Sequence, residues 1–563
     1  MSTTANWADP GNNAKADDAL SVEKPQPVGQ DGIGDVTLTS PRLPRKPKSR
    51  REQSMWLAGY VAASLLLFLC YVRVSGTVPV TADGGNNAMQ AWDMLHGNWL
   101  LRGWVLGDAS YYTTELPEYV LVEIFRGLSS EIVHICGAIT YTLLVVLASL
   151  LAKGDKTGKE GLIRVLIAAG IMIAPQLGPA NAGVLLLEPD HIGTGVPLLL
   201  TFLLLDRSPR RWWVPAAIGL MLAWGQIADQ TVLAMGVLPV VVVCGTRAYR
   251  DIVQRGEPAR AHWFDLALAA SAIASVGAAD AVVKLISSLG GYAVLPVNTT
   301  LAPSAAWPAH VTMVADGVLR LFGAAFYLGP VGLATGLSII HLVGVALALW
   351  AIGCVIRRFF AWDDLIEQIL TVAIVVQVTA YALSTLPYAN YQDHEIAIVL
   401  PFGAVLAARV LAKRLTQARL LPVLAVVACG YLVALGYGMR QPQVPARDAA
   451  LASWLSAHHL TAGLSTYSDA GSVELASHGT VMIAVPHLHQ DDASRGSMFE
   501  ATAANFDPRR HYVNFAVTTK LDGLSFSIPP RALIRAFGEP AHTYHYGAWT
   551  IMTWNKNLLD QFQ

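Results

Sequence analysis

The chain is a succession of long apolar runs separated by polar connectors. A helix that crosses a bilayer needs about 20 mostly apolar residues, because the hydrocarbon core is about 30 Å thick. Most runs approach this length, and the shortest ones need flanking residues to cross. About eleven runs occur, near 55–72, 132–152, 162–179, 192–205, 213–228, 230–246, 263–287, 335–356, 368–388, 395–412 and 420–438. The pattern predicts an α-helical polytopic membrane protein with about eleven transmembrane helices.

The charges predict the orientation of these helices. Every second connector is basic and the others are nearly free of Lys and Arg; the basic connectors lie near 153–159, 207–211, 247–260, 357–358 and 413–419. Cytoplasmic connectors carry an excess of Lys and Arg. We therefore expect a plasma-membrane protein with a cytoplasmic N-terminus and an extracytoplasmic C-terminal end.

Composition changes divide the chain into three parts. Residues 1–54 are polar and lack an apolar period, which predicts a disordered cytoplasmic tail. Residues 55–439 form the predicted membrane domain, with long outer loops at 74–131 and 288–334. Residues 440–563 alternate helix-like and strand-like segments, which predicts a small extracytoplasmic α/β domain.

Bulk composition excludes several classes of protein. Only 14% of the residues are charged, against about 25% in a typical soluble domain, and the net charge of −1 gives no field that attracts nucleic acid. None of the five cysteines lies in 440–563, so the outer domain has no disulfide. The chain has no phosphate-binding loop of the Walker type, no nucleophile elbow and no dinucleotide fingerprint.

The first outer loop is the richest in candidate chemistry. Asp83 follows the first apolar run closely and precedes Gly84 and Gly85, which let a ligand approach the backbone. We predict that Asp83 is a catalytic group. Candidate substrate-binding residues are Asn86, Asn87, Asp93, His96, Arg102, Asp108, Glu115, Glu118 and, between the fifth and sixth runs, Asp229. For Asp93 and Glu118, capping of an interfacial helix is an equal alternative.

A second group of ligand-type side chains lies between the third and fourth runs. Glu188, Asp190 and His191 offer two carboxylates and an imidazole, which suit a divalent cation such as Mg or Mn. The alternative is that Asp190 only caps the following helix. Lesser candidates are the polar tract 391–395 and the pair Asp280 and Lys284, whose spacing favours a simple ion pair within one helix.

The arrangement resembles the GT-C superfamily of membrane glycosyltransferases. Asp83 matches the early-loop carboxylate of that superfamily, and Glu188 with Asp190 match an ExD motif that holds a divalent metal in its oligosaccharyltransferase branch. The blocks AWDMLHGN (91–98), ELPEY (115–119) and PDHxGT (189–194) more closely resemble a group of uncharacterised actinobacterial multi-span membrane proteins. A WWD-type motif is missing from the outer domain, so the resemblance does not imply transfer to asparagine.

The resemblance implies an inverting glycosyltransferase of the cell envelope. The expected donor is a polyprenyl-phosphate sugar, the expected acceptor is an extracytoplasmic glycan, lipid or protein, and Asp83 is the expected general base. The alternative is a transporter or a non-enzymatic membrane scaffold. Transporters usually place ionisable groups near the bilayer midplane, whereas the acids here cluster at outer helix ends.

Overall fold

The computed structural model describes residues 50–80, 82–175, 184–186, 191–208, 210–295, 299–387, 393–487, 497–498, 500–519 and 528–562. The chain divides into two compact units, Met1–Ala58 and Gly59–Gln563. Most of the predicted disordered tail, residues 1–49, lies outside the described residues, and residues 50–54 open helix α1.

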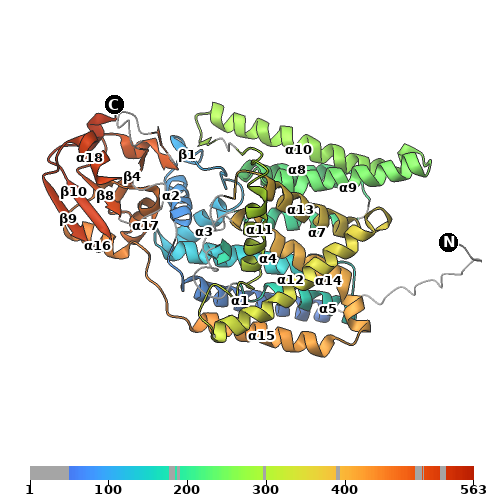
Figure 1. Ribbon diagram of the computed structural model, residues 1–563. Coiled ribbons are helices and arrows are strands. Elements are labelled where there is room, and N and C mark those ends of the chain that lie inside the picture. Colours follow the sequence, from blue (N-terminus) through green and yellow to red (C-terminus); the bar gives the residue numbers. More distant parts are fainter. Residues whose placement is uncertain are drawn as a thin grey trace, which may run out of the picture. The chain divides into compact units, whose positions relative to one another are not determined.

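Each of the predicted apolar runs corresponds to a helix (Figure 1). The helices are α1 (Arg50–Ser75), α4 (Glu131–Lys153), α5 (Gly158–Met172), α7 (Gly195–Arg207), α8 (Val214–Ala228), α9 (Leu238–Tyr249), α10 (Trp263–Ser288), α12 (Leu333–Arg357), α13 (Leu365–Leu383), α14 (Val399–Gln417) and α15 (Leu421–Arg440). Within the described residues, eight helical segments are long and apolar enough to cross a membrane. The other three, α5, α7 and α8, are shorter. The chain is therefore a multi-pass α-helical membrane protein.

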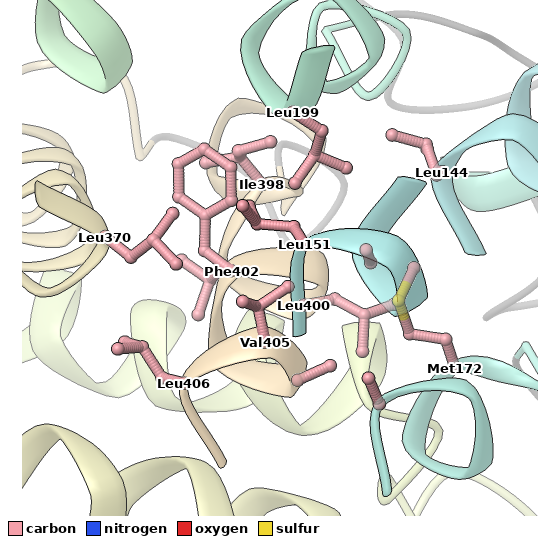
Figure 2. Packing of buried hydrophobic residues seen from close by; sticks show 14 of the residues in the cluster. Leu144, Leu151, Met172, Leu199, Leu370, Ile398, Leu400, Phe402, Val405 and Leu406 are labelled. Atoms are coloured by element: carbon pink, nitrogen blue, oxygen red, sulfur yellow. The ribbon is translucent and has the colours of Figure 1, made fainter. Parts of the chain in front are cut away.

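Helix α14 lies at the centre of the bundle. It contacts α4, α5, α12 and α13. In the most apolar 18-residue stretch of the helical segment Asp393–Gln417, 94% of the residues are buried inside the protein. Figure 2 shows Phe402 and its neighbours from α14 packed against leucines of α4, α7 and α13. A helix that is apolar on most sides belongs inside a bundle, and α14 has no charged residue before Arg409.

One buried cation, in the second half of α14, pairs with residues of several other helices. Arg409 is 7% exposed, and its guanidinium lies 3.0 Å from Asp206 and 2.8 Å from Asp364. It also lies 3.5 Å from Glu367 and donates to the Leu151 carbonyl oxygen at 2.9 Å. These partners come from α4, α7, α13 and the residue that caps α13.

The two long loops that the sequence predicts to lie outside, called the outer loops, contain helices of their own. The first holds α2 (Ala82–Leu95) and α3 (Leu116–Arg126), and the second holds α11 (Trp307–Leu321). Helix α2 packs against α3 and, from far along the sequence, against α17 (Tyr467–Ala476) (Figure 1).

The C-terminal region is built around a mixed five-stranded sheet. Its order is β4-β3-β8-β10-β9, with β3 parallel to both neighbours and β10 antiparallel to both neighbours. The strands are β3 (Ala462–Leu464), β4 (Met482–Ala484), β8 (Phe515–Thr519), β9 (His542–Tyr546) and β10 (Trp549–Thr553). Helices α16 (Ala449–Ala457), α17 and α18 (Pro530–Phe537) complete the α/β fold that the composition predicts.

A second, small sheet connects three distant parts of the chain. Strand β1 (Trp104–Leu106) of the first outer loop pairs with β2 (Ala293–Val294) of the second loop and with β7 (Ala501–Thr502) of the C-terminal region. An additional bond runs from the Ala503 amide to the Gly103 carbonyl oxygen at 2.8 Å. This sheet fixes the C-terminal region against both outer loops.

Candidate functional site

Asp83 lies in the first turn of α2 and lines a small polar cavity. The cavity has a volume of about 50 Å³ and is lined by Asp83, Asn86, Asn87, Gln90, Gly107, Asp108, Ala109, Tyr111 and Glu500. The helix places Asp83, Asn86, Asn87 and Gln90 on one side, because residues three and four apart share a helix face. Four of the predicted site residues, Asp83, Asn86, Asn87 and Asp108, thus meet at one cavity.

The C-terminal region reaches this cavity because two glycines let the helices touch. Gly85 of α2 and Gly471 of α17 cross so closely that a methyl carbon on either one would lie 2.9 Å from the carbonyl carbon of the other. At this crossing, the Tyr467 hydroxyl donates to Asp83 Oδ1 at 2.5 Å. Burial and the charges of Asp83 and Glu500 raise the pKa of Tyr467, which therefore stays a hydrogen-bond donor.

Glu500, the residue directly before β7, lines the same cavity. Its Oε2 accepts a hydrogen bond from Asn86 Nδ2 at 3.2 Å, and the charge of its carboxylate helps to raise the pKa of Tyr467. Glu500 has a φ of 45°, in the left-handed region that non-glycine residues rarely adopt. Such strain persists where the surroundings impose it, and it is common at functional sites.

His191 is a buried side chain that lies between the half-exposed Asp108 and the buried Asp229 in one polar network. Its Nδ1 lies 2.9 Å from Asp229 Oδ2, and its Nε2 lies 3.8 Å from Asp108 Oδ2. Asp229 is 1% exposed and also accepts from the Thr194 hydroxyl at 2.6 Å and from the Thr231 amide at 2.8 Å. Asp229 is therefore almost fully buried and holds the His191 ring in place.

The acids of this network have low pKa values. Burial would raise the pKa of Asp108, but the hydrogen bond and charge of His191, together with His394, lower it to about 2. Burial would also raise the pKa of Asp229, but the charge of His191 and the hydrogen bonds from His191, Thr194 and Thr231 lower it. Both carboxylates are thus ionised at neutral pH.

Three ligand-type side chains converge beside this network. Donor atoms of His191, His394 and Glu395 all lie within 4.8 Å of one another, and the two imidazole rings stack with centroids 5.6 Å apart. Two imidazoles and one carboxylate are a donor set that zinc takes in proteins. If Nε2 of His191 is the ligand, the bond from Nδ1 to Asp229 provides the carboxylate that usually orients a metal-bound histidine. The residues thus fit a transition-metal ion better than Mg.

Glu115 and Glu118 line a different cavity, of about 40 Å³, with Gly193 and Trp224 among its other walls. Glu115 is 2% exposed and hydrogen bonds with Thr114, while its Oε1 has no hydrogen-bond partner within the described part of the chain. Glu118 accepts from the Thr140 hydroxyl at 2.7 Å. Burial raises the pKa of Glu118 to about 7 and that of Glu115 well above its usual range.

The remaining predicted residues lie elsewhere. Asp93 accepts from Asn98 at 2.6 Å and from the Trp104 indole at 2.7 Å, which anchors the loop after α2. His96 and Arg102 are exposed and do not line either cavity. Glu188 and Asp190 lie outside the described residues, so the metal-site prediction is represented by His191 alone.

Sequence reasoning missed Tyr467 and Glu500. Neither residue stands in a recognisable motif, and Tyr467 lies 384 residues from its partner Asp83. His394 and Glu395 stood in a polar tract at an outer helix end, a weak signal that gave no reason to join them with His191.

The fold of the chain is similar to that of a solved protein structure. ArnT from Cupriavidus metallidurans, solved bound to undecaprenyl phosphate, matches with a TM-score of 0.55 at 13% identity over 89% of this chain and 98% of that chain. This likeness confirms the predicted fold, an α-helical multi-pass membrane domain with a small C-terminal α/β region.

Two structures of the Archaeoglobus fulgidus oligosaccharyltransferase are less similar. The complex with Zn and sulfate matches with a TM-score of 0.45 at 15% identity, over 81% of this chain and 67% of that chain. The complex of that protein, AglB, with an inhibitory peptide and a dolichol-phosphate matches with a TM-score of 0.43 at 11% identity, over 83% and 70%. No protein-family model and no curated protein matches the sequence.

Proposed function

We propose that the protein is an inverting membrane glycosyltransferase that moves a sugar from a polyprenyl-phosphate donor to an extracytoplasmic acceptor. The observation that carries this proposal is the cavity at Asp83, where a carboxylate at the outer end of the first span meets amide and carboxylate groups of the outer loop. The likeness of the fold to ArnT, which was solved bound to undecaprenyl phosphate, supports a lipid-phosphate donor.

In the proposed reaction, Asp83 takes the proton of an acceptor hydroxyl. The acceptor oxygen forms a bond to the anomeric carbon of the sugar while the bond from that carbon to the phosphate oxygen breaks. The lipid phosphate leaves with the bonding electrons, from the opposite face of the sugar. Removal of a proton by a placed carboxylate typically contributes about 10²- to 10⁴-fold to the rate.

The proposal includes a divalent metal held by His191, His394 and Glu395, with Asp108 close to the same histidine. Bound there, the ion would supply positive charge for the leaving phosphate. Asp229 would orient His191 for this role. Asn86, Asn87 and Asp108 remain proposed substrate-binding residues because they line the Asp83 cavity.

The test is a transfer assay with the full-length protein in lipid nanodiscs. The probes are polyprenyl-phosphate donors that carry radiolabelled hexose or pentose. Asp83→Asn should reduce turnover by about 10²-fold or more, with unfolding temperature and donor binding unchanged. Asp280→Asn is the matched control, because that carboxylate is 58% exposed and paired with Lys284 at 2.7 Å. Equal turnover of wild type and Asp83→Asn would disprove the base assignment.

The proposed metal site is tested separately, by the metal content of the protein. Elemental analysis should find a transition metal in the purified protein, and His394→Ala should lower that content. An unchanged metal content in His394→Ala would contradict the site, while the transfer assay would still decide the base.

A further inference from the structure

The C-terminal region contributes one side chain to the lining of the Asp83 cavity, Glu500, and a second, Tyr467, that hydrogen bonds to Asp83. Tyr467 and Glu500 belong to different elements, α17 and the residue before β7, yet both contact the residues of α2 that line the cavity. The Gly85–Gly471 crossing and the β1–β7 pairing fix these two elements independently. The C-terminal region is therefore a wall of the cavity rather than a remote appendage.

The Glu500 carboxylate is held where the chain leaves room for it. A methyl group at Gly107 would collide with Glu500 Oε1, so glycine at 107 makes space for this oxygen. The strained backbone at Glu500, with φ of 45°, shows that its surroundings dictate its conformation. Gly107 lines the same cavity, so the space that it leaves is space within the site.

The polar groups of the cavity mostly accept hydrogen bonds. Asp83 and Glu500 are carboxylates, and Gln90 Oε1 has no hydrogen-bond partner in the described ranges although Gln90 is 3% exposed. A buried acceptor without a donor is costly unless a ligand supplies one. A ligand that satisfies all three groups must donate several hydrogen bonds, as a molecule with neighbouring hydroxyl groups does.

The hydroxyl of Tyr467 makes the two carboxylates, Asp83 and Glu500, different from each other. The Tyr467 hydroxyl has one proton, which it donates to Asp83 at 2.5 Å. A carboxylate has about four lone-pair positions, so Glu500, which accepts a hydrogen bond from Asn86, can accept further hydrogen bonds. Glu500 is thus suited to hold a hydroxyl next to the one that Asp83 would deprotonate.

We infer that Glu500 binds the acceptor, that Tyr467 positions Asp83, and that the acceptor is polyhydroxylated, in the manner of a glycan. The inference rests on the proposed function and deepens it by naming the class of acceptor. Glu500 accepts a hydrogen bond from an acceptor hydroxyl adjacent to the attacking one. The attacking hydroxyl gives its proton to Asp83, whose carboxylate is held in one orientation by Tyr467.

The experiment compares two acceptors with the full-length protein in nanodiscs at saturating polyprenyl-phosphate sugar. An octyl glycoside offers several hydroxyls, and 1-octanol offers one. Glu500→Gln should lower kcat/KM for the octyl glycoside by about 10- to 100-fold, mostly through KM, because a hydrogen bond to a charged group is lost. Transfer to 1-octanol should not change. Gly107→Ala displaces the same carboxylate without changing its charge and should reproduce the pattern.

Tyr467→Phe has a different expected signature. It keeps the ring and removes the hydroxyl, so kcat should fall for both acceptors with little change in KM. Controls in the same region are Glu539→Gln, an exposed carboxylate, and Tyr512→Phe, whose side chain is 58% exposed. Neither control substitution should change kcat or KM for transfer to either acceptor.

The outcomes separate this inference from the proposed function. If Asp83→Asn abolishes transfer while Glu500→Gln and Gly107→Ala use the octyl glycoside as well as wild type does, the inference fails and the proposed function stands. The inference also fails if Glu500→Gln loses bound metal instead of acceptor affinity. If wild type consumes no donor with any acceptor, including water, the proposed function fails and the inference falls with it.

Discussion

The crossing of α2 and α17 gives a sharp quantitative prediction for Gly471→Ala. The new methyl carbon would lie 2.9 Å from the Gly85 carbonyl carbon and 3.0 Å from the Asn86 amide nitrogen. Carbon atoms in contact prefer about 3.5–4.0 Å, so the two helices would have to separate by roughly 0.5–1 Å. The obstacle is backbone on both sides, which cannot rotate away as a side chain can.

The magnitude follows from two opposing terms. Overpacking of this kind costs about 1–3 kcal/mol, and alanine regains up to about 1 kcal/mol over glycine inside a helix. We expect a net loss of about 1–2 kcal/mol at the crossing, which corresponds to a factor of about 5–30 in the equilibrium for local opening. The Tyr467–Asp83 hydrogen bond lies at this crossing and should weaken with it.

Hydrogen exchange measured by mass spectrometry on the full-length protein is the assay. Amides of α2 and α17 should exchange about 5- to 30-fold faster in Gly471→Ala. Gly353→Ala is the control, because a methyl group there meets no atom within 4 Å. Wild-type or slower exchange in both helices of Gly471→Ala would refute the close crossing.

Three further predictions concern other parts of the chain. Burial raises the pKa of Glu474 from 4.5 to about 7, so between these pH values the folded state holds a proton that the unfolded chain releases. The contribution of Glu474 to the unfolding free energy should be fully present below pH 4.5 and fall by up to about 3 kcal/mol as pH rises through 7. Glu474→Gln should flatten this pH dependence, measured by hydrogen exchange of β4. Arg409→Met should lower the unfolding free energy by about 3–5 kcal/mol, because Asp206, Asp364 and Glu367 lose their cation, and an unchanged unfolding temperature would contradict the ion cluster. Reporters fused after Arg447 and at Asp155 should lie outside and inside the cell, respectively, and finding both on one side would overturn the predicted orientation.

The class of fold could be predicted from the sequence because bilayer physics acts locally. An apolar run of sufficient length must become a helix wherever it lies, since lipid satisfies no backbone hydrogen bonds. The same holds for short-range contacts. The Asp280–Lys284 pair, predicted from its four-residue spacing, has an ion pair of 2.7 Å. The position of Asp83 beside two glycines was likewise visible in the sequence, and the structure places it at a cavity.

Only the tertiary structure brought together residues that share no local pattern. Hydrophobic periodicity identifies the helices, but the approach of α17 to α2 depends on two single glycines 386 positions apart in the numbering, Gly85 and Gly471. The meeting of His191 with His394, and of Asp83 with Tyr467 and Glu500, follows from how the helices and the small three-stranded sheet pack. Sequence therefore determined the membrane helices and the candidate carboxylates, because those depend on local hydropathy and spacing. Packing over long sequence separations decided which side chains share a cavity.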